Sequence, residues 1–462
     1  MCGSIFLLTT FTLFCTTIVH GQSEALFLTP LIASGNISLA RNLSLVLPLP
    51  NSSPDIPSRS SYSGLITVNE TNNSNLFFWF FPATAKCRED DNAPIVLWLD
   101  GGPGVSNFLS IFTQNGPFSV KSNVDGIFSL EPRLEDWTVN RSIIYLESPV
   151  DVGFSFSSNP AGLPKTSEEA AEDTVEFLRQ FFLLFPEYIT NPFYLAGQSY
   201  GGHFAPAVGT ALHQRNECKR ETRINFQGML LIAPWTNPFA QVDSYADYMY
   251  QTGLIDEMAR DDFVVNQEFI KKLITERKYV EAKDVWADML LNPDSTFNAA
   301  SGFTTAFTLL EDELDLSSYL FANYVELPEF RQAIHVGNLT YTLVSAAIQN
   351  SMTEEFMASK SDHIEQLLDA KKYKVVVATG QLDLTVLHNG VEKMLNHLVW
   401  SGQNEWNRSH RTIWKGANGR VIGYKKEVTN LTLYLIRNAG HMLIGDQPGW
   451  NLELINKELI CL

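Results

Sequence analysis

The sequence has few cysteines and none of the common metal-binding motifs. Only five of its 462 residues are cysteine, and Cys2 and Cys15 lie in an N-terminal apolar segment. The other three, Cys87, Cys218 and Cys461, permit at most one intrachain disulfide, and their pairing stays open. The spacings CxxC and HExxH and the EF-hand loop are absent, so we predict no metal and no cofactor. Stability must therefore come mostly from a hydrophobic core, which a chain of this length can supply.

Positive charge and long apolar runs are also scarce. The chain has 33 Lys and Arg against 51 Asp and Glu, which gives a formal net charge of −18. We therefore predict no nucleic acid partner and no anionic membrane surface as partner, since both recruit basic patches. The apolar run of residues 5–19 is too short to span a bilayer, and small residues follow it. We interpret residues 1–21 as a signal peptide and expect no membrane span.

Sequons for N-glycosylation are frequent. The nine Asn-x-Ser/Thr sequons begin at Asn36, Asn42, Asn51, Asn69, Asn72, Asn140, Asn338, Asn407 and Asn430. They fit a surface exposed to the secretory pathway. We therefore predict a glycoprotein that is secreted or lysosomal. The sequence leaves open whether it is a monomer or a homodimer.

Short β-rich apolar runs alternate with helical stretches, which predicts an α/β fold with a mostly parallel sheet covered by helices. The expected strands are 94–100, 142–148, 193–197, 228–234, 373–380 and 431–440, preceded by an antiparallel pair at 62–69 and 75–83. Residues 166–185 form the clearest helix, which Thr166 or Ser167 can cap and Pro186 ends. Between 240 and 328 the strand signal disappears. We expect a catalytic core of residues 22–239 and 329–462, with residues 240–328 inserted as a helical cap.

The stretch FYLAGQSYGG contains Gly-x-Ser-x-Gly at Gly197, Ser199 and Gly201. The motif alone is weak, but here it follows an expected strand and leads into a helical stretch. That context is typical of a nucleophile elbow, in which small flanking residues permit the sharp turn that exposes the serine. The alternative is an ordinary strand-to-helix turn.

A serine nucleophile needs a base and an orienting acid, in the chain order Ser, Asp, His for this architecture. Asp383 and His441 each follow an expected strand at its carboxyl end, where α/β active sites gather. We expect His441 to take the Ser199 proton and Asp383 to orient the imidazole. A solvated or packed role is expected for the other histidines in predicted helices or loops, namely His203, His335, His363, His388 and His397.

The loop DGGPG can supply an oxyanion hole together with the amide of Tyr200. Gly101, Gly102 and Gly104 let this backbone approach a substrate closely. The alternative is a tight turn, since Gly-Pro pairs are common turn formers. A phosphate-binding loop is disfavoured because no Gly-Lys-Ser/Thr lies nearby.

The segments WLDGGPGVSN, NGPF, ESPVDVGFSFS, FPEY, AGQSYGG, GQLD and AGHMLIGDQP together resemble the serine carboxypeptidase family. LFLTPLI, NSNLFFWFFPA and FRQAIHVGN are similar to its vitellogenic-like branch. The resemblance runs from about residue 25 to the C-terminus. It implies an α/β-hydrolase fold with a helical cap, and release of C-terminal amino acids from peptides at acidic pH. It also implies a triad of Ser199, Asp383 and His441, oxyanion amides at Gly102 and Tyr200, and Met442 lining the leaving-residue pocket.

Three positions depart from the family pattern. The resemblance assigns recognition of the substrate carboxylate to an Asn and two Glu, and this chain has Asp100, Gln114 and Gln198 there. We include Gly101 among the expected substrate-binding residues. The glutamines can donate hydrogen bonds at any pH, whereas Asp100 donates only when protonated. Either the pKa of Asp100 is raised so that it shares a proton with the substrate, or the pocket accepts an amide, an ester or an amine-bearing group.

Three functional hypotheses follow. The first is a serine carboxypeptidase with unusual recognition of the C-terminal group. The second is an esterase or acyltransferase of the same family, which the Gln198 position motivates. The third is a catalytically weak binding homologue, against which the complete triad argues. The preferred leaving residue, the pH optimum and any activating cleavage stay open.

Overall fold

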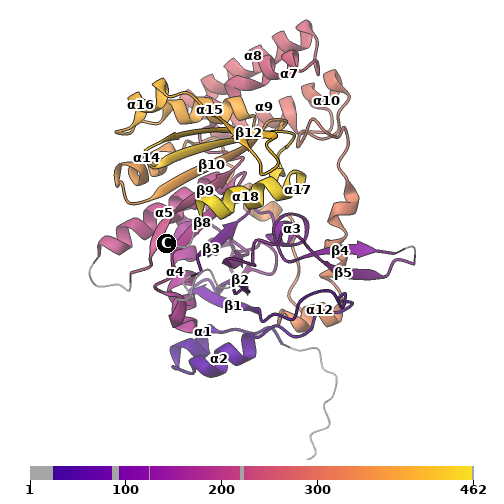
Figure 1. The fold of residues 1–462 in the computed structure, drawn as a ribbon, viewed down its shortest axis with the longest axis vertical. Helices are drawn as coiled ribbons and strands as arrows, with labels where there is room; N and C mark the ends of the chain where they lie inside the picture. The colour runs from indigo at the N-terminus through magenta and orange to yellow at the C-terminus, as the bar shows by residue number, and fades with distance from the viewer. Residues whose placement is uncertain (1–23, 86–92, 124, 219–222, 460–462) are drawn as a thin grey trace, which may run out of the picture.

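The computed structural model describes residues 24–85, 93–123, 125–218 and 223–459 (Figure 1). The interpreted signal peptide, Cys87 and Cys461 lie outside these ranges. Strands in the described residues are β1 (Tyr62–Asn69), β2 (Ser74–Phe81), β3 (Ile95–Leu99), β4 (Phe118–Ser122), β5 (Phe128–Pro132), β6 (Ser142–Leu146), β7 (Phe156–Ser157), β8 (Phe193–Gln198), β9 (Phe226–Ile232), β10 (Lys374–Gly380), β11 (Thr412–Lys415), β12 (Val421–Val428) and β13 (Leu431–Ile436).

Within the described residues one sheet of eleven strands dominates. Its order is β1-β2-β6-β3-β8-β9-β10-β13-β12-β11, with β7 paired to β2, and β4 and β5 form a separate hairpin. The strands from β6 to β13 in this order run parallel, and the pairs at both ends are antiparallel. The predicted α/β class with a mostly parallel sheet is therefore confirmed.

The central strands are continuous apolar runs because they are covered on both faces. Every residue of β3, β6, β8 and β13 is buried, as the sequences IVLWL, SIIYL, FYLAGQ and LTLYLI suggest. Such runs are typical of parallel strands between helical layers. The strand predicted at 228–234 is β9, which ends two residues earlier because the chain turns at Ala233, where φ is +44°.

The α-helices in the described residues are α1 (Thr29–Ala33), α2 (Ile37–Ser44), α3 (Phe108–Thr113), α4 (Ser167–Leu184), α5 (Gly201–Glu217), α6 (Pro238–Gln241), α7 (Tyr245–Gln251), α8 (Glu257–Thr275), α9 (Tyr279–Leu290), α10 (Thr296–Ser301), α11 (Phe321–Tyr324), α12 (Pro328–Ala333), α13 (Ala346–Ser351), α14 (Ser361–Asp369), α15 (His388–His397), α16 (Gln403–Arg408), α17 (Leu443–Asp446) and α18 (Pro448–Glu458). Short 3-10 helices are Pro160–Gly162, Pro186–Tyr188, Val242–Ser244 and Leu316–Tyr319.

Helix α4 begins where the sequence predicts it. The Thr166 side chain accepts a hydrogen bond from the Glu169 amide at 3.2 Å, and Glu168 and Glu169 stand in the first turn. An oxygen cap and acids at this end satisfy free amides and oppose the positive end of the helix dipole. Helix α4 packs against α5, the helix that follows Ser199.

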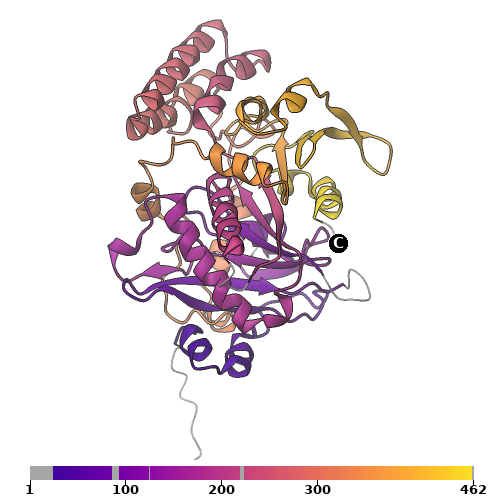
Figure 2. The ribbon, with the colours of Figure 1, turned by 90° about the vertical axis from the view of Figure 1, so that its left-hand side faces the viewer.

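Residues 240–328 contain helices and no strand, and all of them are within the described ranges. Figure 1 and Figure 2 show α7 to α10 gathered at one end of the molecule, opposite α1 and α2. Helices α8 and α9 pack against each other. Where this helical cap begins and ends as a domain stays a prediction.

The predicted glycosylation sites lie at or near the surface. Six of the nine asparagines are exposed, and three are partly exposed, namely Asn69, Asn72 and Asn430. Asn430 Nδ2 donates to the carbonyl oxygens of Leu368 at 3.1 Å and Tyr373 at 2.9 Å. A glycan would have to replace a hydrogen on this nitrogen, which makes Asn430 the least favourable of the nine sites. Cys218 is exposed just after α5 and forms no disulfide within the described residues.

Candidate active site

Ser199 occupies a sharp turn between β8 and α5. Its φ is +56°, a left-handed conformation that is unusual for a side-chain-bearing residue and common at functional sites. The flanking glycines leave room for this turn, because a Cβ on Gly197 would lie 2.2 Å from the Gly201 oxygen. The Ser199 amide donates to the Ile232 carbonyl at 2.9 Å, and the Ser199 carbonyl accepts from Trp235 at 2.9 Å. The serine is therefore held by the neighbouring strand end.

Asp383 and His441 come together at the ends of adjacent parallel strands, β10 and β13. His441 Nδ1 lies 2.8 Å from Asp383 Oδ2, and both side chains are buried. Asp383 Oδ1 accepts two further bonds at 2.8 Å each, from the amides of Thr385 and Val386. The carboxylate thus holds the proton on Nδ1 and leaves Nε2 of His441 free to act as a base. Ser199 and His441 line one cavity of about 470 Å³.

A segment from the helical cap region covers His441. The Phe307 ring stacks on the imidazole with centroids 5.5 Å apart and planes 19° apart, and the His441 amide donates to the Phe307 carbonyl at 2.7 Å. A Cβ on Gly440 would lie 2.5 Å from Thr308 Cβ, so only glycine fits beneath this segment. Thr385 Oγ1 also donates to the Ala306 carbonyl at 2.7 Å. Sequence reasoning missed this segment, which carries no motif.

The DGGPG loop lies directly against the nucleophile turn. A Cβ on Gly101 would be 2.6 Å from the Tyr200 nitrogen, and Gly102 has a φ of +109°. Among the described residues, the amides of Gly102 and Tyr200 donate to no protein acceptor. Both residues line the cavity beside Ser199. Two free amides next to a serine are the arrangement that stabilises a developing oxyanion.

Of the three residues expected to depart from the family pattern, Asp100 and Gln114 are joined through Ser110 in a buried polar cluster. Ser110 Oγ donates to Asp100 Oδ1 at 2.9 Å and accepts from Gln114 Nε2 at 2.9 Å. Gln198 Nε2 contacts Met442 Sδ at 3.3 Å. Asp100 Oδ2, Gln114 Oε1 and Gln198 Oε1 have no hydrogen-bond partner among the described residues. Two buried amide oxygens and one carboxyl oxygen are therefore left without a protein partner.

Burial changes the chemistry of Asp100. It raises the pKa of the Asp100 carboxyl from 3.8 to about 7, an effect that the Ser110 hydrogen bond partly opposes. A buried carboxyl resists ionisation because the charged form loses its hydration. Asp100 is therefore a neutral acid, able to donate a hydrogen bond, at any pH below about 7.

A second buried acid stands behind this cluster. Glu147 accepts hydrogen bonds from Ser106 Oγ at 2.8 Å and the Asn107 amide at 3.3 Å. Burial raises the pKa of Glu147 to about 8, and the nearby Asp100 charge adds to this. Asn107 links the two acids, since its Oδ1 accepts from the Asp100 amide at 2.9 Å. Glu147 lies within the segment ESPVDVGFSFS, but the sequence analysis assigned it no role. The available signal was an acid directly after the buried strand SIIYL.

Part of the cavity wall is aromatic. Trp235 and Trp286 have ring centroids 5.2 Å apart, and Phe356 lies 5.4 Å from Trp286. Lys283 of α9 also lines the cavity, with Nζ 5.4 Å from the Phe356 ring centroid. A mostly apolar cavity with a few polar groups at one end suits a peptide side chain beside a reacting carbonyl.

Most of the residues expected at the site line this one cavity. They are Asp100, Gly101, Gly102, Gln198, Ser199, Tyr200, His441 and Met442. Asp383 and Gln114 do not line it: Asp383 lies behind His441, and Gln114 lies behind Ser110. Within the described ranges no group of three or more His, Cys, Asp or Glu residues could hold a metal ion.

The profile of the family described as serine carboxypeptidase matches residues 50–459. The chain belongs to the serine carboxypeptidase family. It is 38% identical over 439 residues to the venom serine carboxypeptidase of Apis mellifera, covering 94% of this chain and 90% of that protein. It is 34% identical over 443 residues to the probable serine carboxypeptidase CPVL of Homo sapiens, with the same coverage of 94% and 90%. The expected family and its vitellogenic-like branch are therefore confirmed.

Further comparisons agree with this assignment. The vitellogenic carboxypeptidase of Aedes aegypti is 34% identical over 444 residues, with 94% of this chain and 90% of that protein covered. Among solved structures, the Kex1(delta)p carboxypeptidase of Saccharomyces cerevisiae matches with a TM-score of 0.78 at 19% identity, over 90% of this chain and 95% of that one. This likeness establishes the α/β-hydrolase fold. The protein is thus a hydrolase of the serine carboxypeptidase type, and no helix in its described residues is long and apolar enough to cross a membrane.

Proposed function

We propose that this serine carboxypeptidase releases C-terminal residues from peptides through an acyl-enzyme formed on Ser199. The observation that carries the proposal is the buried pair His441–Asp383, whose histidine shares one cavity with a serine in a left-handed turn. Ser199 Oγ attacks the scissile carbonyl carbon and its proton passes to His441 Nε2. The resulting oxyanion accepts hydrogen bonds from the amides of Gly102 and Tyr200, each worth about 3 kcal/mol in the transition state.

Collapse of this intermediate breaks the C–N bond. His441 gives its proton to the leaving amine, and the C-terminal amino acid departs. Water then enters, loses a proton to His441 and attacks the acyl carbonyl, which returns Ser199 and releases the shortened peptide. Asp383 stabilises the imidazolium in both half-reactions.

Recognition of the substrate carboxylate would fall to Asp100 and Gln198. With its pKa raised to about 7, Asp100 holds a proton at acidic pH and can donate it in a hydrogen bond to the carboxylate. Gln198 donates through its amide, which can turn so that Nε2 leaves the weak Met442 sulfur acceptor. Gln114 supports Asp100 through Ser110. Above about pH 7 the ionised Asp100 would repel the same carboxylate.

The test compares a blocked dipeptide with its C-terminal amide at about pH 5 and about pH 8, on either side of the Asp100 pKa. Release from the free acid that is faster at the lower pH supports the proposal. Ser199→Ala is the control for contaminating peptidase. Equal rates at the two pH values for the free acid would refute the role of Asp100 and leave the triad intact.

A second candidate function is hydrolysis of a C-terminal amide or an ester. Asp100 Oδ2 and Gln198 Oε1 have no hydrogen-bond partner among the described residues, and both residues line the cavity, which favours an end group that donates hydrogen bonds. Preference for the dipeptide amide in the same assay would select this candidate. Failure of an organophosphonate to label Ser199 would refute both.

We also propose that the enzyme follows the secretory route. Six exposed sequon asparagines support this, as do the words venom and vitellogenic in the names of its relatives. Expression in insect cells should give a product in the medium whose mass falls after treatment with an N-glycosidase. Retention of an unglycosylated product in the cytosol would contradict the proposal.

A further inference from the structure

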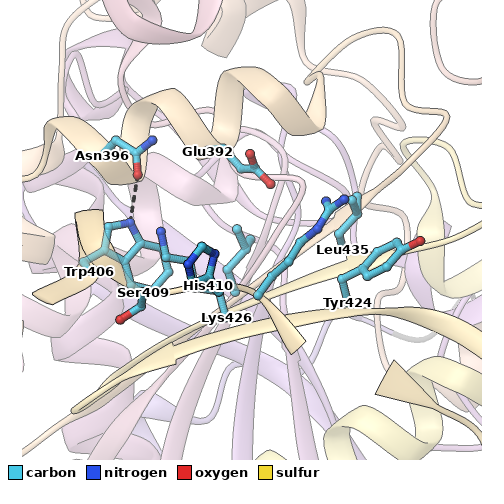
Figure 3. A pocket seen from close by; sticks show the side chains of 10 residues that line it. Glu392, Asn396, Trp406, Ser409, His410, Tyr424, Lys426 and Leu435 are labelled. Carbon is cyan, nitrogen blue, oxygen red and sulfur yellow. Dashed lines mark hydrogen bonds between the residues drawn. The ribbon is translucent and has the colours of Figure 1, made fainter. Parts of the chain in front are cut away.

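A second cavity of about 220 Å³ lies between α15, α16 and the end of the sheet formed by β12 and β13 (Figure 3). It shares no lining residue with the active-site cavity. Its lining includes the cations Arg411 and Lys426, the imidazole of His410, and the rings of Trp406 and Tyr424. Glu392 is the single acid among the described residues that line it.

Both cations are held in place by the rings. Lys426 Nζ lies 4.3 Å from the centroid of Trp406, and Arg411 Cζ lies 4.2 Å from the centroid of Tyr424. The Trp406 indole is fixed in turn by a 3.0 Å hydrogen bond to Asn396 Oδ1. Contacts of this kind attract the cation and restrict its side chain while its N–H groups stay available to a ligand. Neither cation has an ion-pair partner among the described residues.

The alternation of the β11–β12 hairpin puts these cations on one face. Ile413 is paired with Tyr424 across the hairpin, so Arg411, two residues before Ile413, lies on the face of Tyr424 and Lys426. Lys425 points to the other face, where it pairs with Glu427 at 2.7 Å and Glu458 at 3.5 Å. Lys425 is therefore paired with two acids, whereas Lys426 has no ion pair among the described residues and shares the cavity lining with Glu392.

The hairpin is basic in an acidic protein. Residues 408–426 hold six Lys and Arg and no Asp or Glu, whereas the whole chain has a net charge of −18. Apart from Lys425, these cations form no ion pair with a described residue; they are Arg408, Arg411, Lys415, Arg420 and Lys426. The hairpin projects from the edge of the sheet (Figure 2). A basic hairpin with two of its unpaired cations, Arg411 and Lys426, in the lining of a small cavity attracts a linear polyanion.

We propose that this basic hairpin and its cavity bind a sulfated polysaccharide, with one sulfate group between Arg411 and Lys426. A single-stranded nucleic acid would need free aromatic faces for base stacking, but Trp406 and Trp414 are buried and Arg411 covers Tyr424. An anionic membrane would need several apolar side chains to insert, and in residues 408–426 Ile413 is the one exposed large apolar side chain. Glu392 opposes an anion, so the sulfate must lie on the hairpin side of the cavity. The choice of an extracellular polysaccharide rests on the proposed secretory route.

The test measures binding of the glycosylated full chain to heparin oligosaccharides at about 0.15 M salt, with chemically desulfated heparin as the ligand control. Arg411→Gln/Lys426→Gln should raise Kd by about tenfold or more, because two charge-assisted contacts are lost. Lys121→Gln/Arg277→Gln removes the same charge from exposed sites elsewhere and should leave Kd unchanged. Arg411→Gln alone leaves the Lys426–Trp406 contact in place and should give part of the effect. Turnover of the peptide substrate should be the same in all variants.

Several outcomes would overturn the proposal. They are no binding by the natural protein, equal weakening in the two double variants, or equal affinity for desulfated heparin. Binding to phosphatidylserine vesicles without binding to heparin would assign the basic hairpin to a membrane surface instead. Asn407 is exposed on α16 beside the cavity. Heparin binding that appears only in Asn407→Gln would also overturn the proposal for the glycosylated protein, because a glycan would then cover this surface.

Discussion

Replacing Asp100 with asparagine should stabilise the folded protein above about pH 7 and leave its stability near pH 4 unchanged. Burial raises the pKa of this carboxyl from 3.8 to about 7, so the folded state holds the proton more tightly than the unfolded state. An acid whose pKa is raised in the folded state contributes fully to the free energy of unfolding below pH 3.8, and this contribution is lost as the pH rises through about 7. The pKa of Asp100 is about 3 higher in the folded state than in the unfolded state, and a difference of one corresponds to about 1.4 kcal/mol. The ionised carboxyl therefore costs about 4 kcal/mol at pH 8.

The introduced asparagine has the same size as the aspartic acid and no proton to lose, and its oxygen can accept from Ser110 as Asp100 Oδ1 does. Urea denaturation followed by tryptophan fluorescence at about pH 4, 6 and 8 measures the expected difference between the two proteins. The gain should grow with pH and reach a plateau above about 7. Asp312→Asn, at an exposed position, controls for the change in net charge and should alter stability by less than about 0.5 kcal/mol.

The same substitution separates stability from recognition. Asp100→Asn donates a hydrogen bond at every pH, so turnover of the free-acid dipeptide should persist above pH 7, where the natural enzyme loses it. A stability gain that is equal at all three pH values would refute the buried, protonated Asp100. A pH profile of kcat/KM unchanged by the substitution would show that another group controls substrate binding.

Three further substitutions test the architecture of the site. Ser199→Ala should lower kcat by about a millionfold without unfolding the protein, measured by dipeptide hydrolysis and circular dichroism; residual turnover within tenfold of the natural enzyme would contradict its role as nucleophile. Gly440→Ala should push the Phe307 segment outward, since its Cβ would lie 2.5 Å from Thr308 Cβ, and lower kcat by about 100-fold; an unchanged rate would show that the segment does not position His441. Lys360→Met removes the buried partner of Glu355, whose carboxylate also accepts a hydrogen bond from the Tyr200 hydroxyl at 3.2 Å, and should cost about 3 to 5 kcal/mol in urea denaturation. Lys360→Met/Glu355→Gln should recover much of this loss; equal losses would mean that the pair is not coupled.

The sheet was readable from the sequence because its central strands are buried on both faces. Such strands are apolar along most of their length, and short apolar runs such as IVLWL and SIIYL are typical of buried parallel strands. The β11–β12 hairpin was not predicted, because its strands are not buried on both faces. Its strands TIWK and VIGYKKEV mix charged and apolar residues because one edge faces solvent, and no single period dominates. The β4–β5 hairpin, FSVKS and FSLEP, is short and half-exposed in the same way.

The expected site residues were predicted from local motifs, since Ser199, Asp383 and His441 each follow a strand in a short recognisable context. Features that depend on contacts between distant parts of the chain could not be predicted from the sequence. Phe307 reaches His441 from 134 positions away in a segment without a motif, and nothing local marks it. The net charge of −18 likewise concealed the basic hairpin, because a sum over the chain erases a local excess.

Asp100 and Glu147 together tie the stability of the fold to the pH at which the proposed reaction would run. Burial raises the pKa of both acids, to about 7 and about 8, and Asn107 hydrogen-bonds to the Glu147 carboxylate and to the main-chain amide of Asp100. Both therefore favour the folded state most at acidic pH, where a chain with a net charge of −18 also loses self-repulsion as its surface acids take up protons. The proton on Asp100 that stabilises the site is the one that the proposed mechanism offers to a substrate carboxylate. An enzyme built in this way gains stability and substrate recognition from the same protonation and loses both as the pH rises.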